Sequence, residues 1–247
     1  MNTSDMKAFF WDEMMDKLTT KSIFDGLELI WINIKHRIMS LIDFIKVASK
    51  YYSHFPFMKA DLSLLIFYLL DSPFVISRRF LQEKGEANIH AYGETPLTSA
   101  QLIAETCNIT EKDHVFELGC GRGRTCFWLK YFIDCHVTGI DFVPKFIERA
   151  NRIKTKLKVD NVTFIQDDFM EADFQEATVI YLYGTMLDDD AITSLTKKFK
   201  KLTPGTKVIT VSYPLSDYSD DDTFELMKRF TVPYPWGTTD VYLQIIK

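Results

Sequence analysis

The chain changes its pattern of apolar and polar positions at about residue 91. Beyond this point, short runs rich in β-branched and aromatic residues alternate with stretches whose apolar residues recur at helical spacing. The runs predict strands at residues 114–118, 136–141, 162–166, 179–183 and 207–211. The stretches between them predict helices near residues 123–131, 144–157 and 189–200. This alternation favours a parallel sheet with helices on both faces.

The last part of the chain has a different pattern. Residues 224–231 and 239–246 are strand-like, and the segment that joins them has no helical periodicity. Two strands joined in this way pair antiparallel. The sequence therefore predicts an α/β fold whose mostly parallel sheet is closed by an antiparallel last strand.

Residues 1–90 predict a separate α-helical region that precedes an α/β domain over residues 91–247. Apolar side chains recur there at roughly helical spacing among charged ones, which indicates two or three amphipathic helices. The recurring residues are Ile23, Leu27, Ile30, Trp31, Ile38, Leu41, Ile42 and Ile45. These helices pack either on the following domain or on a second copy of the chain, or they dock on a membrane surface. The region holds eleven basic and eleven acidic side chains, so it lacks the basic excess that anionic lipid attracts, which favours packing.

Composition narrows the possible functions. The net charge of −5 argues against a nucleic-acid partner, because such proteins carry a basic surface. Residues 1–17 lack the apolar core of a signal peptide, and the apolar run at residues 62–70 is too short to span a bilayer. The four cysteines form no C-x-x-C pair, and the five histidines show no metal-ligand spacing. We therefore expect a cytoplasmic protein with reduced thiols and without a metal site.

A glycine-rich loop follows the first predicted strand and precedes a helix. The sequence VFELGCGRGR at residues 115–124 places Gly119, Gly121 and Gly123 in this loop. Glycine at such positions lets a ligand approach the backbone closely. Arg124 stands where a dinucleotide-binding loop has its third glycine, so the spacing disfavours NAD and FAD.

Acidic and aromatic residues stand near the ends of the first three predicted strands. Glu117, just before the glycine loop, would repel a pyrophosphate but suits a positive charge or an amino group. Asp141 ends the second strand, where a carboxylate accepts hydrogen bonds from ribose hydroxyls. The candidate adenine contacts are Asp168 and Phe169, which follow the third strand, and Phe142 is a further candidate cofactor contact. Together these residues suit a ligand with a ribose, an adenine and a positive centre but no diphosphate, and S-adenosylmethionine meets each requirement.

Residues 92–247 resemble the class I S-adenosylmethionine-dependent methyltransferases. The motifs that carry the resemblance are FELGCGRG, VTGID, FIQDDF and LTPGTKVI. The resemblance implies a Rossmann-like sheet with an antiparallel last strand. It also implies S-adenosylmethionine as the cofactor and methyl transfer as the activity.

The segment AYGETP at residues 91–96 adds a narrower resemblance. It is similar to the motif that closes over the cofactor in the non-SET histone lysine methyltransferases, and the layout also resembles that of lysine methyltransferases of the ATP synthase c-subunit. This likeness implies cofactor contacts by Tyr92, Glu94 and Thr95, and a protein lysine as the methyl acceptor. The alternative for the segment is a turn followed by a Thr or Ser helix cap.

The acceptor itself is not fixed by a signature. Residues 180–186 lack the Asn-rich motif that the histone enzymes carry at this place. A small molecule or a lipid headgroup is therefore an alternative acceptor. A further alternative is a non-catalytic module that only binds S-adenosylmethionine.

The end of the fourth predicted strand is where this fold places the methyl acceptor. Tyr181 and Tyr183 point to one face of that strand. We take Tyr183 as the candidate catalytic residue, because a water-poor aromatic pocket lowers the pKa of an amine and stabilises its cation. Packing of both tyrosines against a helix is the alternative.

Three acidic or aromatic segments have ordinary explanations beside functional ones. The aspartates at residues 188–190 predict a helix cap rather than a Mg²⁺ site. Those at residues 220–222 predict a solvated loop or a helix start. Residues 233–236 either line the substrate mouth or form a plain loop.

Overall fold

The computed structural model describes residues 41–86, 88–234 and 237–247. Residues 49–247 form one compact unit, which is separate from residues 1–48. The predicted amphipathic helices before residue 41 lie outside the described residues, as does the segment considered for a signal peptide. So do residues 235 and 236 of the candidate substrate mouth. The division of the chain at residue 90 stays a prediction.

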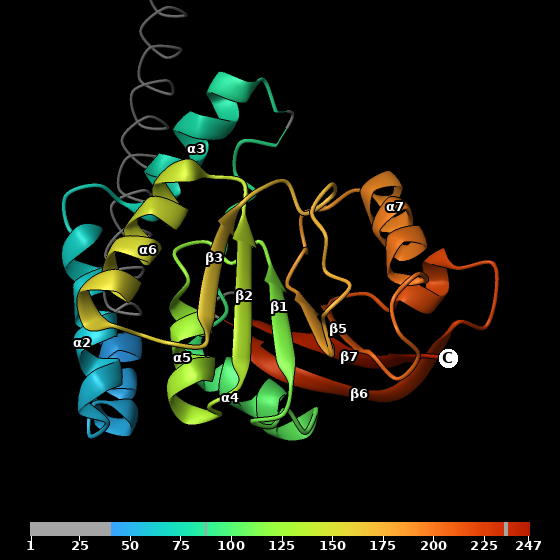
Figure 1. The fold of residues 1–247 in the computed structure, drawn as a ribbon. Coiled ribbons are helices and arrows are strands. Elements are labelled where there is room, and N and C mark those ends of the chain that lie inside the picture. The colour runs from blue at the N-terminus through green and yellow to red at the C-terminus, as the bar shows by residue number, and fades with distance from the viewer. Residues whose placement is uncertain (1–40, 87, 235–236) are drawn as a thin grey trace, which may run out of the picture. The chain divides into compact units, whose positions relative to one another are not determined.

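A seven-stranded sheet runs through the compact unit in the order β3-β2-β1-β4-β5-β7-β6 (Figure 1). The strands are β1 (His114–Leu118), β2 (His136–Asp141), β3 (Val162–Gln166), β4 (Val179–Leu182), β5 (Lys207–Val211), β6 (Phe224–Tyr234) and β7 (Gly237–Ile246). The first five strands pair in parallel, whereas β7 is antiparallel to both β5 and β6. The structure confirms the predicted α/β fold and its antiparallel end.

Two strand boundaries differ from the sequence prediction. β4 ends at Leu182, so Tyr183 lies one residue beyond the strand that was predicted to contain it. β6 extends to Tyr234, so Pro233 and Tyr234 belong to a strand and not to a loop. Both differences lie where the chain approaches the candidate acceptor site.

The central strands are buried on both faces, as parallel strands covered by helices must be. Every residue of β4 is buried, and β1 and β5 are buried beyond their first residue. The later helical elements are α4 (Leu97–Thr106), α5 (Arg124–Phe132), α6 (Pro144–Leu157), α7 (Asp189–Phe199) and the short 3-10 helix η1 (Leu215–Tyr218). Asp188 caps α7 by accepting a hydrogen bond from the Ala191 N–H at 2.8 Å, which confirms the predicted helix cap.

Helices α2 (Phe55–Phe67) and α3 (Pro73–Lys84) come before the sheet in the chain. The ring of Phe57 on α2 lies 5.2 Å from that of Phe132 on α5. The ring of Phe80 on α3 lies 5.1 Å from that of Phe142, which follows β2. α2 also lies beside α6 (Figure 1). These two helices therefore pack on the α/β part of the chain.

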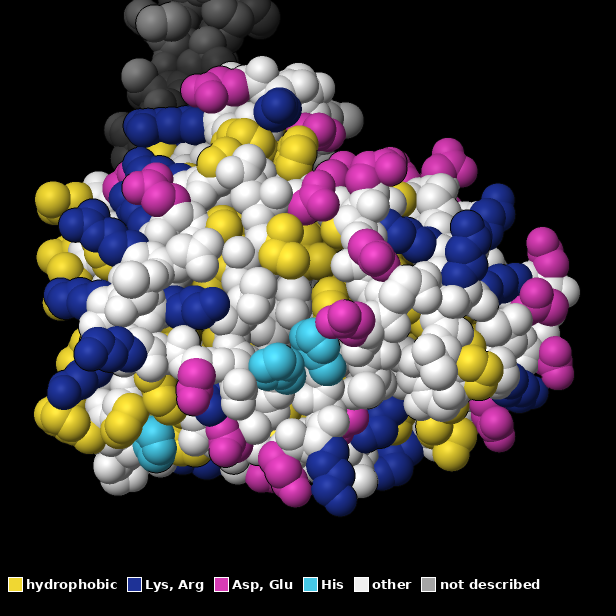
Figure 2. Space-filling view, viewed as in Figure 1, with side chains coloured by type: hydrophobic (Ala, Val, Ile, Leu, Met, Phe, Trp, Pro, Cys, Tyr) yellow, Lys and Arg dark blue, Asp and Glu magenta, His cyan; other side chains and the backbone are white. Residues whose placement is uncertain are grey.

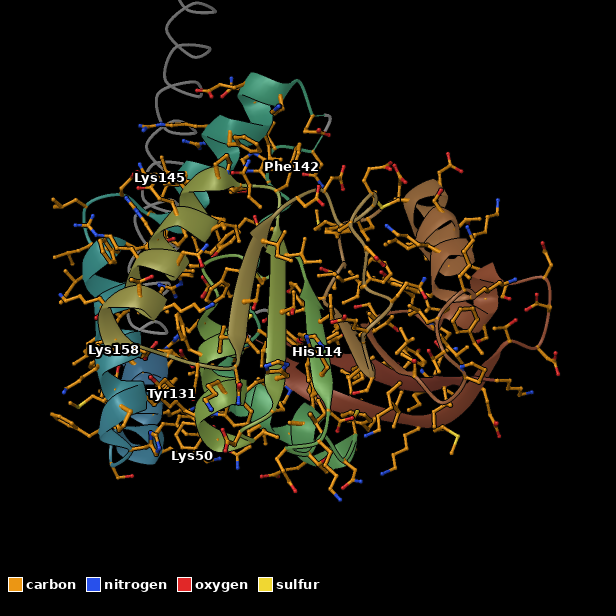
Figure 3. The ribbon with its side chains drawn as sticks, in the orientation of Figure 1. Lys50, His114, Tyr131, Phe142, Lys145 and Lys158 are labelled. Carbon is orange, nitrogen blue, oxygen red and sulfur yellow. The ribbon has the colours of Figure 1, made fainter. Side chains whose placement is uncertain are left out.

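Charged side chains are unevenly spread over the surface. Figure 2 shows Lys and Arg side chains gathered over α6, where Lys145, Arg152 and Lys158 are exposed. His114 and His136 begin β1 and β2, with their rings 5.0 Å apart, and so lie at the opposite end of these strands from the glycine loop (Figure 3). All four cysteines are buried and free.

No helix in the described residue ranges has both the length and the apolar character needed to cross a membrane. Within the same ranges, no three or more His, Cys, Asp or Glu side chains gather as a group that would hold a metal ion.

Candidate cofactor and acceptor site

A pocket lies beside the glycine loop, at the carboxyl ends of β1 and β4. β1 stands between β2 and β4, which is the place in an open parallel sheet where ligands bind. The pocket is lined by Gly93, Glu94, Thr95, Glu117, Gly119, Cys120, Arg122, Arg124, Thr125 and Tyr183. Half of these were predicted as site residues. The other predicted residues, which do not line it, are Tyr92, Gly121, Gly123, Asp141, Phe142, Asp168 and Phe169.

The glycine loop needs its glycines for backbone conformation. Gly119, Gly121 and Gly123 all have left-handed backbone angles, with φ of 76°, 55° and 75°. A Cβ on Gly123 would lie 2.4 Å from Cε1 of Phe164, and one on Gly121 would lie 3.0 Å from Cε2 of Tyr92. Two of the three glycines therefore make room for protein rings, and not only for a ligand as the sequence suggested.

Asp141 holds the glycine loop in place. Its buried carboxylate accepts hydrogen bonds from Gly121 N–H at 2.7 Å and from Val143 N–H at 2.9 Å. Burial raises the pKa of Asp141 to about 6, against the lowering effect of these two hydrogen bonds. A carboxylate has lone pairs for further donors, so the group still suits ribose hydroxyls.

Of the predicted cofactor contacts, Asp168 and Phe169 follow β3, whereas Phe142 follows β2. Cε1 of Phe169 is 3.8 Å from the position that a Cβ on Gly119 would take, which brings this ring beside the glycine loop. Asp168 accepts a hydrogen bond from Met170 N–H at 2.8 Å. The ring of Phe142 lies against α3 instead (Figure 3).

Glu117 is a buried carboxyl without a cation. The thiol of Cys126 donates a hydrogen bond to it at 2.9 Å, and among the described residues it forms no ion pair. Burial raises the pKa of Glu117 to about 8, and hydrogen bonds from Cys126 and Thr125 oppose this rise. The group is therefore largely protonated at pH 7, and a ligand that brings a positive charge would favour its ionised form.

Two arginines of the glycine loop form buried ion pairs with residues from earlier in the chain. Arg122 donates to Glu94 through Nε at 2.6 Å and Nη2 at 2.7 Å. Arg124 donates to Asp61 of α2 through Nε at 2.6 Å and Nη2 at 3.0 Å. Burial would raise the pKa of Glu94, but Arg122 outweighs it and lowers this pKa below its usual value. No role was predicted for Asp61 from the sequence. Its position as an acidic residue at the edge of the apolar run at residues 62–70 could have indicated a buried ion pair.

Residues 91–96 cover the glycine loop. The Tyr92 ring lies against Gly121, 5.1 Å from the ring of Phe74, and its hydroxyl donates to Glu94. The hydroxyl groups of Thr95 and Tyr181 lie 2.5 Å apart. The alternative prediction, a Thr or Ser cap on the next helix, is wrong, because Pro96 caps α4 without a side-chain hydrogen bond.

Tyr183 forms an aromatic wall of the pocket. The ring of Tyr183 stacks on that of Tyr234, with centroids 5.3 Å apart and planes at 15°. Tyr183 also lies so close to Gly93 that a Cβ there would be 2.8 Å from its Cε1. Tyr181 is buried behind this wall, with its hydroxyl 3.5 Å from that of Tyr234. Tyr183 was the predicted catalytic residue, and Tyr234 belongs to the segment 233–236 that was considered for the substrate mouth.

The fold and the site together define a class of protein. The sheet order with an antiparallel β7, the glycine loop after β1 and the acidic residue at the end of β2 are those of a class I S-adenosylmethionine-dependent methyltransferase. The residues present fit this cofactor. Glu117 and Asp141 offer carboxyls for an ammonium group and ribose hydroxyls, while guanidinium groups line the same pocket.

Comparison with known proteins agrees with this class. The family model of the ANTKMT methyltransferase domain matches residues 117–222. A protein-lysine N-methyltransferase of Saccharolobus islandicus is 24% identical over 137 residues, which are 55% of this chain and 84% of that protein. A sterol 24-C-methyltransferase of Debaryomyces hansenii is 26% identical over 142 residues, which are 56% of this chain and 38% of that enzyme.

A solved structure also supports this class of protein. The crystal structure of an RNA methyltransferase from Salinibacter ruber in complex with S-adenosyl-L-homocysteine has a TM-score of 0.51 and 28% sequence identity. The match covers 62% of this chain and 94% of the chain in that crystal structure. The described domain is therefore a class I S-adenosylmethionine-dependent methyltransferase domain, and S-adenosylmethionine is its cofactor. The chain spans well under half the length of the sterol enzyme that it matches.

Proposed function

We propose that this protein transfers a methyl group to the side-chain amine of a lysine in a protein substrate. The observation that carries the proposal is the aromatic wall of the pocket beside the cofactor loop, which is formed by Tyr183 with the ring of Tyr234 stacked on it. The archaeal protein-lysine N-methyltransferase supports it, because the match spans most of that protein.

The chemistry of lysine explains why such a wall is useful. An unperturbed lysine has a pKa of about 10.4, so removing its proton at pH 7 costs about 4.6 kcal/mol. A neutral, water-poor pocket lowers that pKa, because burial disfavours the charged form. The bound S-adenosylmethionine supplies the methyl group, which forms a bond to the amine nitrogen as its bond to sulfur breaks. The nitrogen then loses a proton.

The site residues take two kinds of role in this proposal. Tyr183 borders the acceptor amine, and its ring face stabilises the methylated cation by about 0.5–2 kcal/mol. The cofactor is held by the glycine loop with the surrounding residues Tyr92, Glu94, Thr95, Glu117, Gly119, Gly121, Gly123, Asp141, Phe142, Asp168 and Phe169.

A small molecule or a lipid is the second candidate acceptor. The matches to sterol 24-C-methyltransferases favour it, since they are as similar in sequence as the lysine enzyme. Those matches cover a much smaller share of the relative, which is why we place this function second.

Labelled methyl transfer separates the candidates. The protein is incubated with S-adenosylmethionine labelled in the methyl group and with a cell extract, and the product is divided into protein and organic-solvent fractions. We expect the label in protein, and after acid hydrolysis in methyllysine. Label only in the organic fraction would favour the second candidate. Cofactor binding without label in any fraction would indicate a non-catalytic module.

Two tyrosine variants serve as a matched pair in this assay. Tyr183→Ala should lose most of the label transfer because it opens the aromatic wall. Tyr131→Ala should keep it, because Tyr131 stands at the far end of α5 from the glycine loop (Figure 3). Equal losses would contradict the role proposed for Tyr183.

A further inference from the structure

The ion pair between Arg124 and Asp61 joins the helical region to the pocket. Asp61 is an acidic residue on the otherwise mostly apolar α2, and its side chain is 0% exposed. Arg124 is 12% exposed and lines the pocket. A buried ion pair adds little net stability, because the cost of desolvation offsets the attraction. What the ion pair does provide is a fixed position for the guanidinium group beside the pocket.

The guanidinium group of Arg124 is held in position by hydrogen bonds to Asp61 of α2. Asp61 binds its Nε and Nη2, and the hydroxyl of Tyr52 donates a further hydrogen bond to Asp61 at 2.9 Å. Arg124 is also the first residue of α5, directly after Gly123. The N-terminus of a helix carries a partial positive charge and attracts anions. The guanidinium group of Arg124 and the N–H groups of the first turn of α5 thus lie at the same end of the pocket.

The methionine part of S-adenosylmethionine carries an ammonium group and a carboxylate on the same carbon. Receptors for the two groups must therefore be neighbours. Glu117 is the buried carboxyl that lacks a cation, and hydrogen bonds connect it to Thr125 and Cys126, the two residues after Arg124. Arg124 thus lies next to the place where an ammonium group would be bound.

Arg122 is the other basic residue among those that line the pocket. Its partner Glu94 belongs to the segment that covers the glycine loop, and Tyr92 of the same segment donates to Glu94. Arg122 therefore holds the segment at residues 91–96 against the glycine loop, whereas Asp61 anchors Arg124 to α2. A guanidinium group has five N–H donors, so one that is paired with a carboxylate has donors for a second.

We propose that Arg124, oriented by Asp61, binds the carboxylate of the methionine part of S-adenosylmethionine. Asp61 is then a positioning residue, and α2 is part of the cofactor site. The inference rests on the cofactor class and not on the acceptor proposed above, because it concerns binding in the absence of any acceptor.

Calorimetry with three ligands tests the proposal on the full-length protein. S-adenosylmethionine and S-adenosylhomocysteine carry the carboxylate, whereas 5′-methylthioadenosine lacks the whole amino-acid part. In Arg124→Met we expect the affinity for the first two ligands to fall on the order of tenfold to 100-fold, the loss typical of a charge-assisted contact. The affinity for 5′-methylthioadenosine should stay nearly unchanged. Asp61→Asn should shift the same ratio in the same direction by a smaller factor.

The ratio between the affinities for the three ligands distinguishes loss of the carboxylate contact from loss of folded protein. A variant that is partly unfolded loses all three ligands alike, whereas loss of a carboxylate contact changes the ratio between them. Arg124→Lys keeps the charge but not the paired geometry, so its ratio should fall between those of the wild type and Arg124→Met. Arg122→Met removes the other arginine of the pocket and frees Glu94 of the covering segment, so it should weaken all three ligands alike and leave the ratio unchanged.

Three outcomes would overturn the proposal. Equal losses for all three ligands in a folded Arg124→Met would give Arg124 a structural role only. An unchanged affinity for S-adenosylmethionine would exclude the contact. A selective loss in Arg122→Met, with none in Arg124→Met, would assign the carboxylate to Arg122 instead.

Discussion

Around the pocket, ionisable carboxyl and guanidinium groups lie at the ends of β1 and β2, whereas tyrosines lie at the ends of β4 and β6. On the first side, which we call the cofactor side, lie the carboxyls of Glu117 and Asp141 and the ion pairs of Arg122 and Arg124. On the second side, the acceptor side, tyrosine rings and hydroxyl groups meet. The carboxyl ends of the strands thus provide two chemically different environments around one pocket.

The difference follows from what each side has to bind. The cofactor carries fixed charges, and a charged ligand is held by charged partners. An acceptor amine must instead give up its proton before it reacts, and a carboxylate close to it would keep it protonated. Residues 91–96 connect the two sides, since Glu94 binds Arg122 while Thr95 binds Tyr181. The predictions below test whether the two sides are as independent as their chemistry is different.

The largest effect is expected from crowding the glycine loop on the cofactor side. Gly123→Ala adds a Cβ 2.4 Å from Phe164 at a left-handed backbone angle, and should lower the free energy of unfolding by about 3–5 kcal/mol. Gly205→Ala is the matched control, because Gly205 has φ of 93° with nothing within 4 Å. It should cost only about 1–2 kcal/mol. Urea unfolding measures both, and equal costs would contradict the steric explanation.

The next effect concerns cofactor affinity. Asp141→Ala leaves the N–H groups of Gly121 and Val143 without an acceptor and removes the proposed ribose contact, so calorimetry should show roughly a 100-fold loss of affinity for S-adenosylhomocysteine. Asp221→Ala is the control, because this exposed carboxylate also accepts a backbone hydrogen bond, from Thr223. A similar loss in both variants would mean that the effect is not specific to the cofactor side.

Glu117 gives the cofactor side a pH dependence. Its pKa is about 8 in the folded protein against an ordinary value of 4.5, so folding favours the protonated form. The contribution of Glu117 to the free energy of unfolding is fully present below about pH 4.5. It is lost as the pH rises through 8, by roughly 1 kcal/mol per pH unit. Urea unfolding of the wild type between pH 5.5 and 8.5 should show this decline.

Glu117→Gln tests the assignment of that decline, because glutamine does not titrate. The variant should be much less dependent on pH, although Asp141, whose pKa is also raised by burial to about 6, contributes with the same sign at lower pH. An unchanged slope in the variant would show that Glu117 is not the group responsible.

The cofactor side was much more predictable from sequence than the acceptor side. The glycine loop and Asp141 lie directly after strands whose apolar runs are easily identified, so local pattern places them. Asp61 and Arg124 are 63 positions apart, and no local pattern shows that α2 brings them together. The wall of Tyr183 and Tyr234 depends on where β4 ends and on how far β6 extends, and strand ends are the least predictable part of a strand.

The smallest effect tests the link between the two sides. Tyr181→Phe removes one hydroxyl from the buried contact with Thr95 and should lower the free energy of unfolding by about 0.5–1.5 kcal/mol. Tyr218→Phe is the control, because its hydroxyl bonds to Asp189 at the surface, where water replaces the lost contact. If the sides act independently, calorimetry of Tyr181→Phe will show an unchanged affinity for S-adenosylhomocysteine. A loss of affinity would mean that Thr95 transmits changes on the acceptor side to the segment that covers the cofactor loop.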